Sequence, residues 1–282
     1  MFRIDTAGRM AAKGQIPIDH FPFAHDFALS SRYAIFFVNS ITMGPVGQVM
    51  LGARSIAEGV AFDPSIPMHI AVVDLDTMTE IRRFETGPGA VVHFGNAFED
   101  GDEVVVDAMF ADNFDANDAL SDIFNAKQLR GGVFRRYRLN LRTGTIGFEE
   151  MSPTNSEFPT FNQHMAGRKH EATYTACSVE NGAASFFNGF QKVTFDGDIT
   201  LNTLDPGLYG SEPLFAPAKH STADDDGYIL EVVYDAHEHV SSLVIFRAAD
   251  IAEPVASLRL RHHLPHQFHG FWHDEVLFDA AR

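Results

Sequence analysis

The sequence is short of cysteine, of positive charge and of long apolar runs. Cys177 is the only cysteine among 282 residues, which excludes an internal disulfide and a cysteine-based structural zinc site. Lys and Arg number 21 against 38 Asp and Glu, and the formal charge of −17 disfavours nucleic acid and anionic membrane surfaces as partners. Since no apolar run reaches about 18 residues and no signal-peptide pattern opens the chain, we expect a cytoplasmic protein without a membrane span.

Several common catalytic motifs are absent as well. The sequence contains no Walker-type phosphate loop, no Gly-rich dinucleotide fingerprint, no G-x-S-x-G and no H-E-x-x-H. The nearest short match, His237-Glu238-His239, directly follows a strand pattern, so we expect it at an exposed hairpin tip. Cys177 lies within the strand-like TYTACSV, which favours a buried thiol over a nucleophile.

The residues that are present alternate between β-branched or aromatic runs and Gly-containing turns. This pattern predicts a large all-β protein built from antiparallel meanders, while only residues 117–128 have helical spacing. Strand spacing alone leaves a sandwich, a barrel and a β-propeller open. No linker or change of composition divides the chain, so we expect a single domain over residues 1–282. The clearest strand runs are 34–41, 70–75, 90–98, 103–110, 133–141, 172–179, 186–195, 228–234, 243–247 and 257–261.

Histidine and phenylalanine are abundant, with 14 and 26 residues, and three histidines lie within apolar segments. These are His25, His93 and His269. An imidazole in such surroundings is either neutral and hydrogen-bonded or bound to a metal, and for each histidine alone the first interpretation is the simpler one. Their wide separation in the chain suits ligands that point inward from different strands. A local zinc site, and with it a zinc hydrolase, is an alternative that no positioned general base supports; it would use His262, His263, His266 and His273.

Seven segments, in order along the chain, resemble the carotenoid cleavage oxygenases, a family that includes apocarotenoid oxygenases and lignostilbene dioxygenases. The resemblance implies a seven-bladed β-propeller with one Fe(II) held by four histidines. It also implies cleavage by O₂ of a carbon–carbon double bond in an apolar carotenoid, apocarotenoid or stilbene, giving two carbonyl products. The segments are HDFALS from His25, VVHFGNAFEDGDEVVVD from Val91, GVFRRYRLNLRTG from Gly132, SEFPTFNQHMAGRKHEATY from Ser156, GSEPLFAP from Gly210, DDDGYILEVVYDA from Asp224 and LPHQFHGFW from Leu264.

The same resemblance assigns roles to individual residues. His25, His93 and His269 match three of the family's iron ligands. Glu157 and Glu212 match carboxylates that accept the remaining N–H of a ligating imidazole, a contact that fixes the tautomer and the orientation of the ring.

The chain also departs from the family pattern at its start. It resembles about the last five blades, so we expect an N-terminally incomplete propeller without the first histidine ligand, and His20 is not expected to replace that ligand. The alternative to an active dioxygenase is an inactive propeller remnant that acts at most as a binding module. Apolar loop residues leave contact with a membrane surface open.

Overall fold

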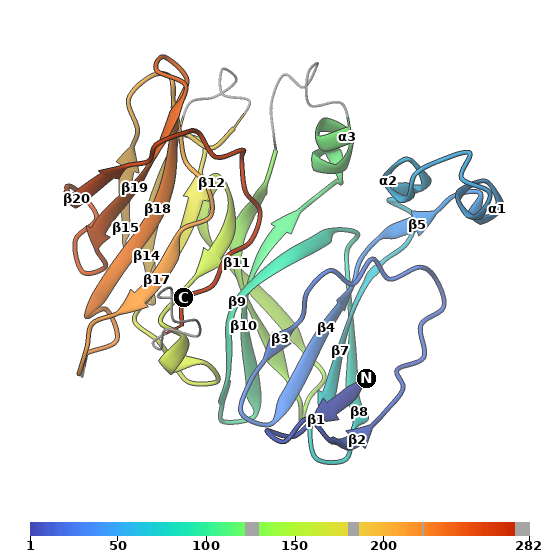
Figure 1. Ribbon diagram of the computed structural model, residues 1–282. Helices are drawn as coiled ribbons and strands as arrows, with labels where there is room; N and C mark the ends of the chain where they lie inside the picture. Colours follow the sequence, from blue (N-terminus) through green and yellow to red (C-terminus); the bar gives the residue numbers. More distant parts are fainter. Residues whose placement is uncertain (122–129, 180–185, 222, 274–282) are drawn as a thin grey trace. The chain divides into compact units, whose positions relative to one another are not determined.

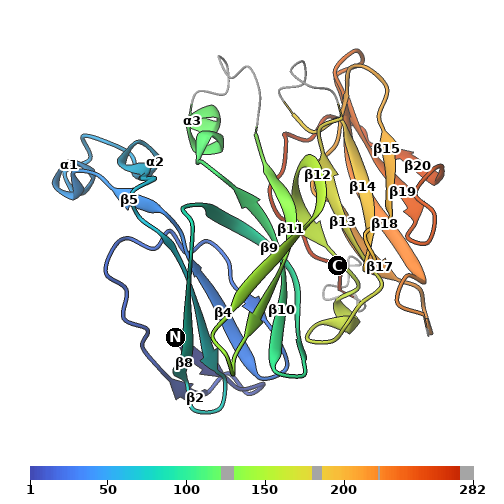
Figure 2. The same cartoon turned by 180° about the vertical axis from the view of Figure 1, so that it is seen from behind.

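The computed structural model describes residues 1–121, 130–179, 186–221 and 223–273 (Figures 1 and 2). The chain divides into two compact units. The first comprises Met1–Asn155 with Ala166–Lys169, and the second comprises Ser156–Met165 with His170–Arg282. Strands make up most of the regular structure in both units, which confirms the all-β prediction. A single domain over residues 1–282 stays a prediction, as does the number of blades.

In its described residues, the first unit is built from antiparallel strands with three short helices. One sheet has the order β3-β4-β7-β8, another part contains β9, β10 and β11 in sequence, and two further pairs are β1-β2 and β5-β6. The strands are β1 (Phe2–Ile4), β2 (Met10–Lys13), β3 (Ala28–Leu29), β4 (Tyr33–Val38), β5 (Ile41–Met43), β6 (Val60–Phe62), β7 (Met68–Asp74), β8 (Thr79–Thr86), β9 (Ala90–Asp100), β10 (Glu103–Ala111) and β11 (Gly132–Asn140). The helices are α1 (Val46–Met50), α2 (Ile56–Gly59) and α3 (Asp115–Ser121).

The core of this unit lies between the inner faces of its sheets. Alternate residues of each strand point inward, so Phe37 of β4 meets Phe94 of β9 and Tyr137 of β11, with ring centroids 5.1 and 5.2 Å apart. A buried ion pair joins neighbouring strands, because Arg136 Nε donates to Asp107 Oδ1 over 2.7 Å at directly opposite positions of β10 and β11. Such a pair fixes the register in which these strands meet.

The second unit begins within β12 (Ile146–Thr160), which starts in the first unit and ends in the second. Its own core joins two sheets, with Phe190 against Phe246 at 4.6 Å and the Tyr174 hydroxyl donating to the carbonyl of Ala248 over 2.7 Å. The further elements are η1 (Gln163–Met165), β13 (Ala172–Cys177), β14 (Gly189–Thr194), β15 (Ile199–Thr203), β16 (Leu208–Tyr209), β17 (Leu214–Pro217), β18 (Gly227–Asp235), β19 (Val240–Arg247) and β20 (Pro254–Arg259).

The predicted strand runs are found, with instructive differences. The run 34–41 is broken at Asn39, whose buried side chain accepts from the N–H of Val91 and donates to its carbonyl, at 2.8 and 2.9 Å. The predicted helix 117–128 is found in part, as α3, which ends at Ser121. Residues 122–128 of the predicted range lie outside the described residues. Helices α1 and α2 were not predicted because each is too short for a helical apolar period.

Candidate metal centre

His93 lies on β9 at a point where the strand departs from regular pairing. The register between β9 and β10 shifts twice, first between Val106 and Ala108 and again between Ala108 and Phe110, and His93 lies in the second irregularity. A bulge re-aims the side chains of the bulged strand. The bulge therefore leaves His93 half-buried on a strand whose neighbouring Phe94 is in the core.

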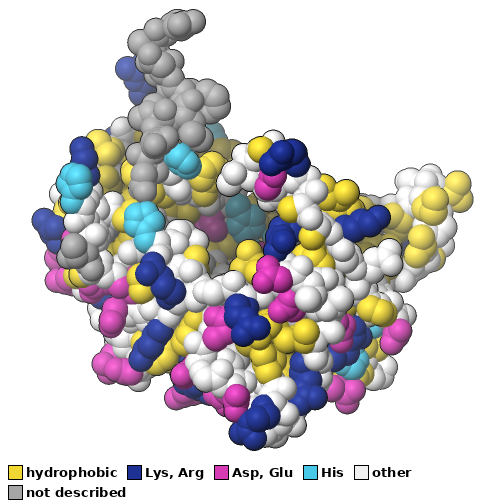
Figure 3. Space-filling view, turned by 90° about the horizontal axis from the view of Figure 1, so that it is seen from below, with side chains coloured by type: hydrophobic (Ala, Val, Ile, Leu, Met, Phe, Trp, Pro, Cys, Tyr) yellow, Lys and Arg dark blue, Asp and Glu magenta, His cyan; other side chains and the backbone are white. Residues whose placement is uncertain are grey.

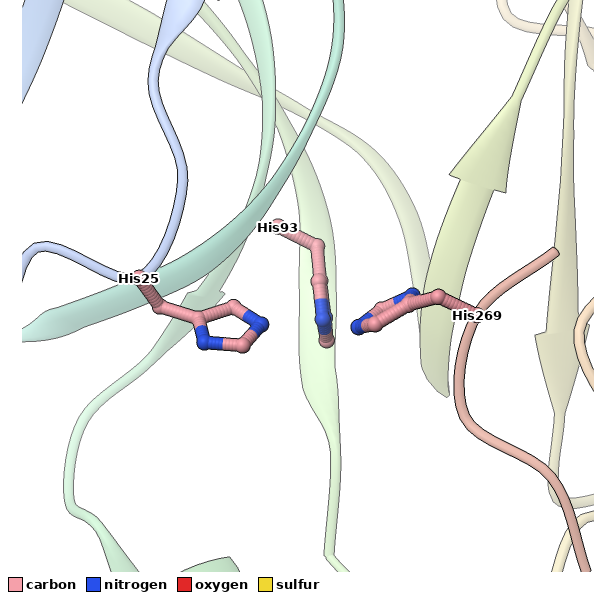
Figure 4. A group of neighbouring side chains, drawn as sticks. All are labelled: His25, His93 and His269. Carbon is pink, nitrogen blue, oxygen red and sulfur yellow. The ribbon is translucent and has the colours of Figure 1, made fainter. Parts of the chain in front are cut away.

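His25 belongs to the same unit and precedes β3 in an extended segment. Its ring meets that of His93 edge to face, with centroids 5.3 Å apart and planes at 85° (Figure 4). One ring nitrogen of each lies within 4.8 Å of the other. At metal–nitrogen distances of about 2.0–2.1 Å, two imidazoles this close need only small side-chain movements to bind one ion.

His269 belongs to the second unit and lies on the segment that follows β20 (Figure 4). Its Nδ1 lies 3.2 Å from Oε1 of Glu212, and the N–H of Gly270 donates to Oε2 of the same carboxylate over 2.6 Å. Glu212 thus holds both the ring and the backbone beside it. With Nδ1–H donated to a carboxylate, Nε2 carries the lone pair and faces away as a ligand atom.

An aromatic side chain that the sequence did not single out supports the same imidazole. Phe158 contacts the His269 ring edge to face at 5.7 Å and the Phe187 ring at 5.9 Å. Its backbone has φ of 57°, a left-handed conformation that is uncommon outside glycine. Because it lies between Glu157 and Pro159 at a register shift of β12, this conformation turns the ring out of the regular strand alternation. No sequence pattern signals that turn.

Glu157, the second carboxylate assigned by resemblance, is half-buried on β12 opposite Ala176 of β13. Its role toward an imidazole stays a prediction.

Each of the three imidazoles offers a donor that suits a transition metal. His25, His93 and His269 can each supply one ring nitrogen, and neutral imidazole binds iron, zinc, copper and nickel well. A carboxylate already bonded to Nδ1 of one imidazole is the arrangement that raises ligand basicity.

The other histidines have different surroundings. His20 donates from Nε2 to the carbonyl of Asn39 over 3.0 Å. His237-Glu238-His239 lies on the exposed turn between β18 and β19, as predicted. In the described part of the chain, no group of three or more potential ligands includes a histidine of the tail segment other than His269. Ring stacking occupies two of them instead, His263 on His239 at 4.1 Å and His266 on Phe186 at 4.0 Å.

The single thiol is not part of this chemistry. Cys177 is completely buried, and burial, with the nearby Glu231 carboxyl as a smaller cause, raises its pKa to about 12. The prediction that this thiol is buried is confirmed.

The surface of the described residues carries mixed charges and a group of exposed apolar side chains. Acidic and basic side chains are interspersed on the face drawn in Figure 3. Helices α1 and α2 and the turn between them expose a set of large apolar side chains, namely Val46, Met50, Leu51 and Ile56. Within the described residues no helix is long and apolar enough to cross a bilayer.

Comparison with known proteins gives one consistent result. Residues 1–274 match the model of the RPE65 family, described as retinal pigment epithelial membrane protein. The apocarotenoid-15,15'-oxygenase of Synechocystis sp. is 30% identical over 276 residues, which cover 96% of this chain and 56% of the relative. The zeaxanthin 7,8(7',8')-cleavage dioxygenase of Crocus sativus is 28% identical, over 97% of this chain and 75% of the relative.

Solved structures agree with the sequence relatives. The structure of cobalt-substituted Synechocystis ACO superposes with a TM-score of 0.84 at 29% identity, over 96% of this chain and 57% of that chain. This likeness confirms the β-propeller class of the fold. The chain spans little more than half the length of these Synechocystis proteins. On the match of the family model to almost all of its residues, this chain belongs to the RPE65 family of carotenoid cleavage oxygenases.

Proposed function

We propose that this chain holds the metal of a dioxygenase that cleaves a carbon–carbon double bond in an apolar conjugated substrate, with His25, His93 and His269 as ligands of one Fe(II). The observation that carries the proposal is the contact of Glu212 with Nδ1 of His269, which presets this imidazole as a ligand. The pair His25 and His93, with ring nitrogens within 4.8 Å, supports it from the first unit.

The chemistry needs no further co-reactant. In the proposed reaction the double bond of the substrate and the bond of O₂ both break, and each alkene carbon gains one oxygen atom to become a carbonyl. Fe(II), when held by these imidazoles, would supply the site at which O₂ reacts. No external reductant is consumed, because all four electrons come from the alkene.

The residues of this chain contribute position and protonation state. Neutral imidazoles at His25 and His93 leave the ion its positive charge. Glu212 keeps the proton of His269 on Nδ1, so that Nε2 stays free of it. We assign Glu157 the same task toward another ligating imidazole. Phe158, on the edge of the His269 ring, adds an apolar wall that excludes water from that side.

The proposed substrates are carotenoids and apocarotenoids, with stilbenes as the other class to be tested. The names of the relatives support this choice, since they describe an apocarotenoid oxygenase and a zeaxanthin cleavage dioxygenase. A chain with 26 Phe can provide an apolar lining for a rigid polyene.

The test is anaerobic loading of the purified chain with Fe(II), followed by O₂ uptake and product analysis with an apocarotenal and a stilbene. We expect one iron per chain and two carbonyl products per O₂. His93→Ala should lose both, and the matched control His237→Ala, on the exposed hairpin, should lose neither.

The outcomes separate the two candidate functions. Stoichiometric iron without cleavage of any polyene or stilbene would favour the inactive binding module over the enzyme. Retention of iron and turnover by His93→Ala would contradict the assignment of the ligands.

We also propose that the exposed apolar side chains of α1, α2 and the turn between them contact a lipid surface. Met50 and Leu51 are 83% and 87% exposed, and neither carries charge. An apolar substrate that partitions into lipid would be taken up at such a surface. With a formal charge of −17, the chain should prefer zwitterionic over anionic lipid.

A further inference from the structure

Glu231 is a completely buried carboxyl in the middle of β18. It lies on the same face of the strand as Ile229 and Val233, which are also buried. Within the described residues, neither of its oxygens has a hydrogen-bond partner of normal geometry. Burial raises the pKa of Glu231 well above its ordinary value, and the backbone N–H of Ser211 is a smaller cause that opposes this shift. A buried polar group of this kind is costly, so its presence calls for a function.

The carboxyl points at a specific piece of backbone. A Cβ placed on Gly210 would overlap Oε1 of Glu231 and lie 3.3 Å from its Cδ. A side chain at position 210 would therefore force this carboxyl to move from its buried position. The N–H of Gly210 is bonded on its other side to the carbonyl of Phe187 over 2.9 Å.

The topology explains why the backbone passes this point. Strand β16 pairs with β18 at Tyr209 and Tyr234, and β17 pairs with it at Leu214 and Leu230. Residues 210–213 lie between these two pairings and leave the ladder opposite residues 231–233. The side chain of Glu231 lies beneath the start of this unpaired segment.

The unpaired segment carries Glu212, whose two oxygens hold Nδ1 of His269 and the N–H of Gly270. A continuous series of contacts thus leads from Glu231 through Gly210 to Glu212 and His269. Because residues 210–213 are not paired with β18, this segment is held instead by the hydrogen bond of Gly210 to Phe187 and by the contact of Gly210 with the Glu231 side chain.

We propose that Glu231 is a positioning residue for the metal centre, which holds residues 210–212 at the height at which Glu212 can orient His269. The inference rests on the proposed function in one respect, namely that His269 is a metal ligand. It gives a role to Glu231, a residue of the segment DDDGYILEVVYDA to which the resemblance assigns none.

The experiment removes the Glu231 carboxyl and adds a methyl group at Gly210, separately and together, in the full 282-residue chain, with Co²⁺ as the probe. Glu231→Ala should weaken Co²⁺ binding about tenfold and shift the visible absorption bands of the bound ion. Loss of a residue that orients a metal ligand typically lowers metal affinity by a factor of this size. Gly210→Ala should do the same by overlap with Glu231. In Gly210→Ala/Glu231→Ala the added methyl occupies the space of the lost carboxyl, so the two losses should not add.

Two further variants separate positioning from general stability. Glu231→Gln keeps the shape and should retain affinity and absorption bands. Gly147→Ala is the matched glycine control, since nothing lies within 4 Å of a Cβ at this exposed position. The thermal midpoint is recorded for every variant, because a merely structural role would lower it and leave the Co²⁺ bands unchanged.

The outcomes are distinguishable. Unchanged bands and affinity in Glu231→Ala, with wild-type protein that binds Co²⁺, would overturn this inference and leave the proposed function standing. Additive losses in the double variant would also overturn it. Failure of the wild-type chain to bind Co²⁺ or Fe²⁺ at all would refute the proposed function and this inference with it.

Discussion

Glu212→Gln perturbs the metal centre at the contact that defines it. The carboxylate uses one oxygen for Nδ1 of His269, at 3.2 Å, and the other for the N–H of Gly270, at 2.6 Å. An amide of the same size has one acceptor oxygen, so its NH₂ group must face one of these two donors. The substitution therefore removes one charge-assisted hydrogen bond and weakens the other.

The structure sets the size of the effect. A hydrogen bond to a charged group contributes about 1.5–3 kcal/mol, and the lower half applies here because the His269 side chain is 45% exposed while Glu212 is 17% exposed. About 1.5–2 kcal/mol corresponds to a loss in metal affinity of roughly 10–30-fold, within the range of about 10–100-fold found for partners of ligating histidines.

The assay is competitive titration of Co²⁺ against a chromophoric chelator at constant pH, with circular dichroism to verify the fold. Glu253→Gln, at an exposed position before β20, is the matched control and should bind like the wild type. A change of less than about twofold in Glu212→Gln would show that this carboxylate does not orient a metal ligand.

Three further predictions concern stability and surface. Arg136→Met removes the guanidinium that balances the fully buried Asp107 and should lower the free energy of unfolding by about 3–5 kcal/mol, measured in urea; a loss below about 1 kcal/mol would contradict it. Because the pKa of Glu231 is raised in the folded protein, its contribution to stability is complete below the ordinary pKa of 4.5 and is lost as the pH rises toward the raised pKa. The thermal midpoint of the wild type should therefore fall between about pH 5 and about pH 8 more steeply than that of Glu231→Gln. The same pH dependence in both proteins would argue against this prediction. Met50→Asp with Leu51→Asp should reduce sedimentation with phosphatidylcholine vesicles about tenfold or more, and undiminished binding would exclude this surface as the lipid contact.

The fold class was predictable because apolar alternation is a local property. Strand β11 buries roughly alternate side chains, and β10 is a continuous buried run from Val104 to Phe110; both patterns can be recognised in the sequence. Strand β12 did not, since its polar residues from Glu149 to Asn155 have no apolar period, and its pairing is decided by the strands beside it. The break at Asn39 was equally hidden, because its partner Val91 is distant in sequence.

The candidate site was predictable only in part, for a related reason. The resemblance identified His269 and Glu212, and the structure brings these two together although 57 residues separate them. Phe158 and Glu231 were not found from the sequence. One depends on a left-handed backbone conformation at a non-glycine residue, and the other on a glycine in a segment that pairs with no strand. Neither the backbone conformation nor the unpaired segment can be recognised from composition or residue spacing.

The most direct test of the account is X-ray absorption spectroscopy of the Fe(II)-loaded chain, which counts the imidazoles bound to the ion. We expect one iron per chain with at least three histidine ligands at about 2.1 Å, and the loss of one imidazole contribution in His269→Ala. A spectrum of the loaded wild type with oxygen ligands alone, unchanged in His269→Ala, would contradict it.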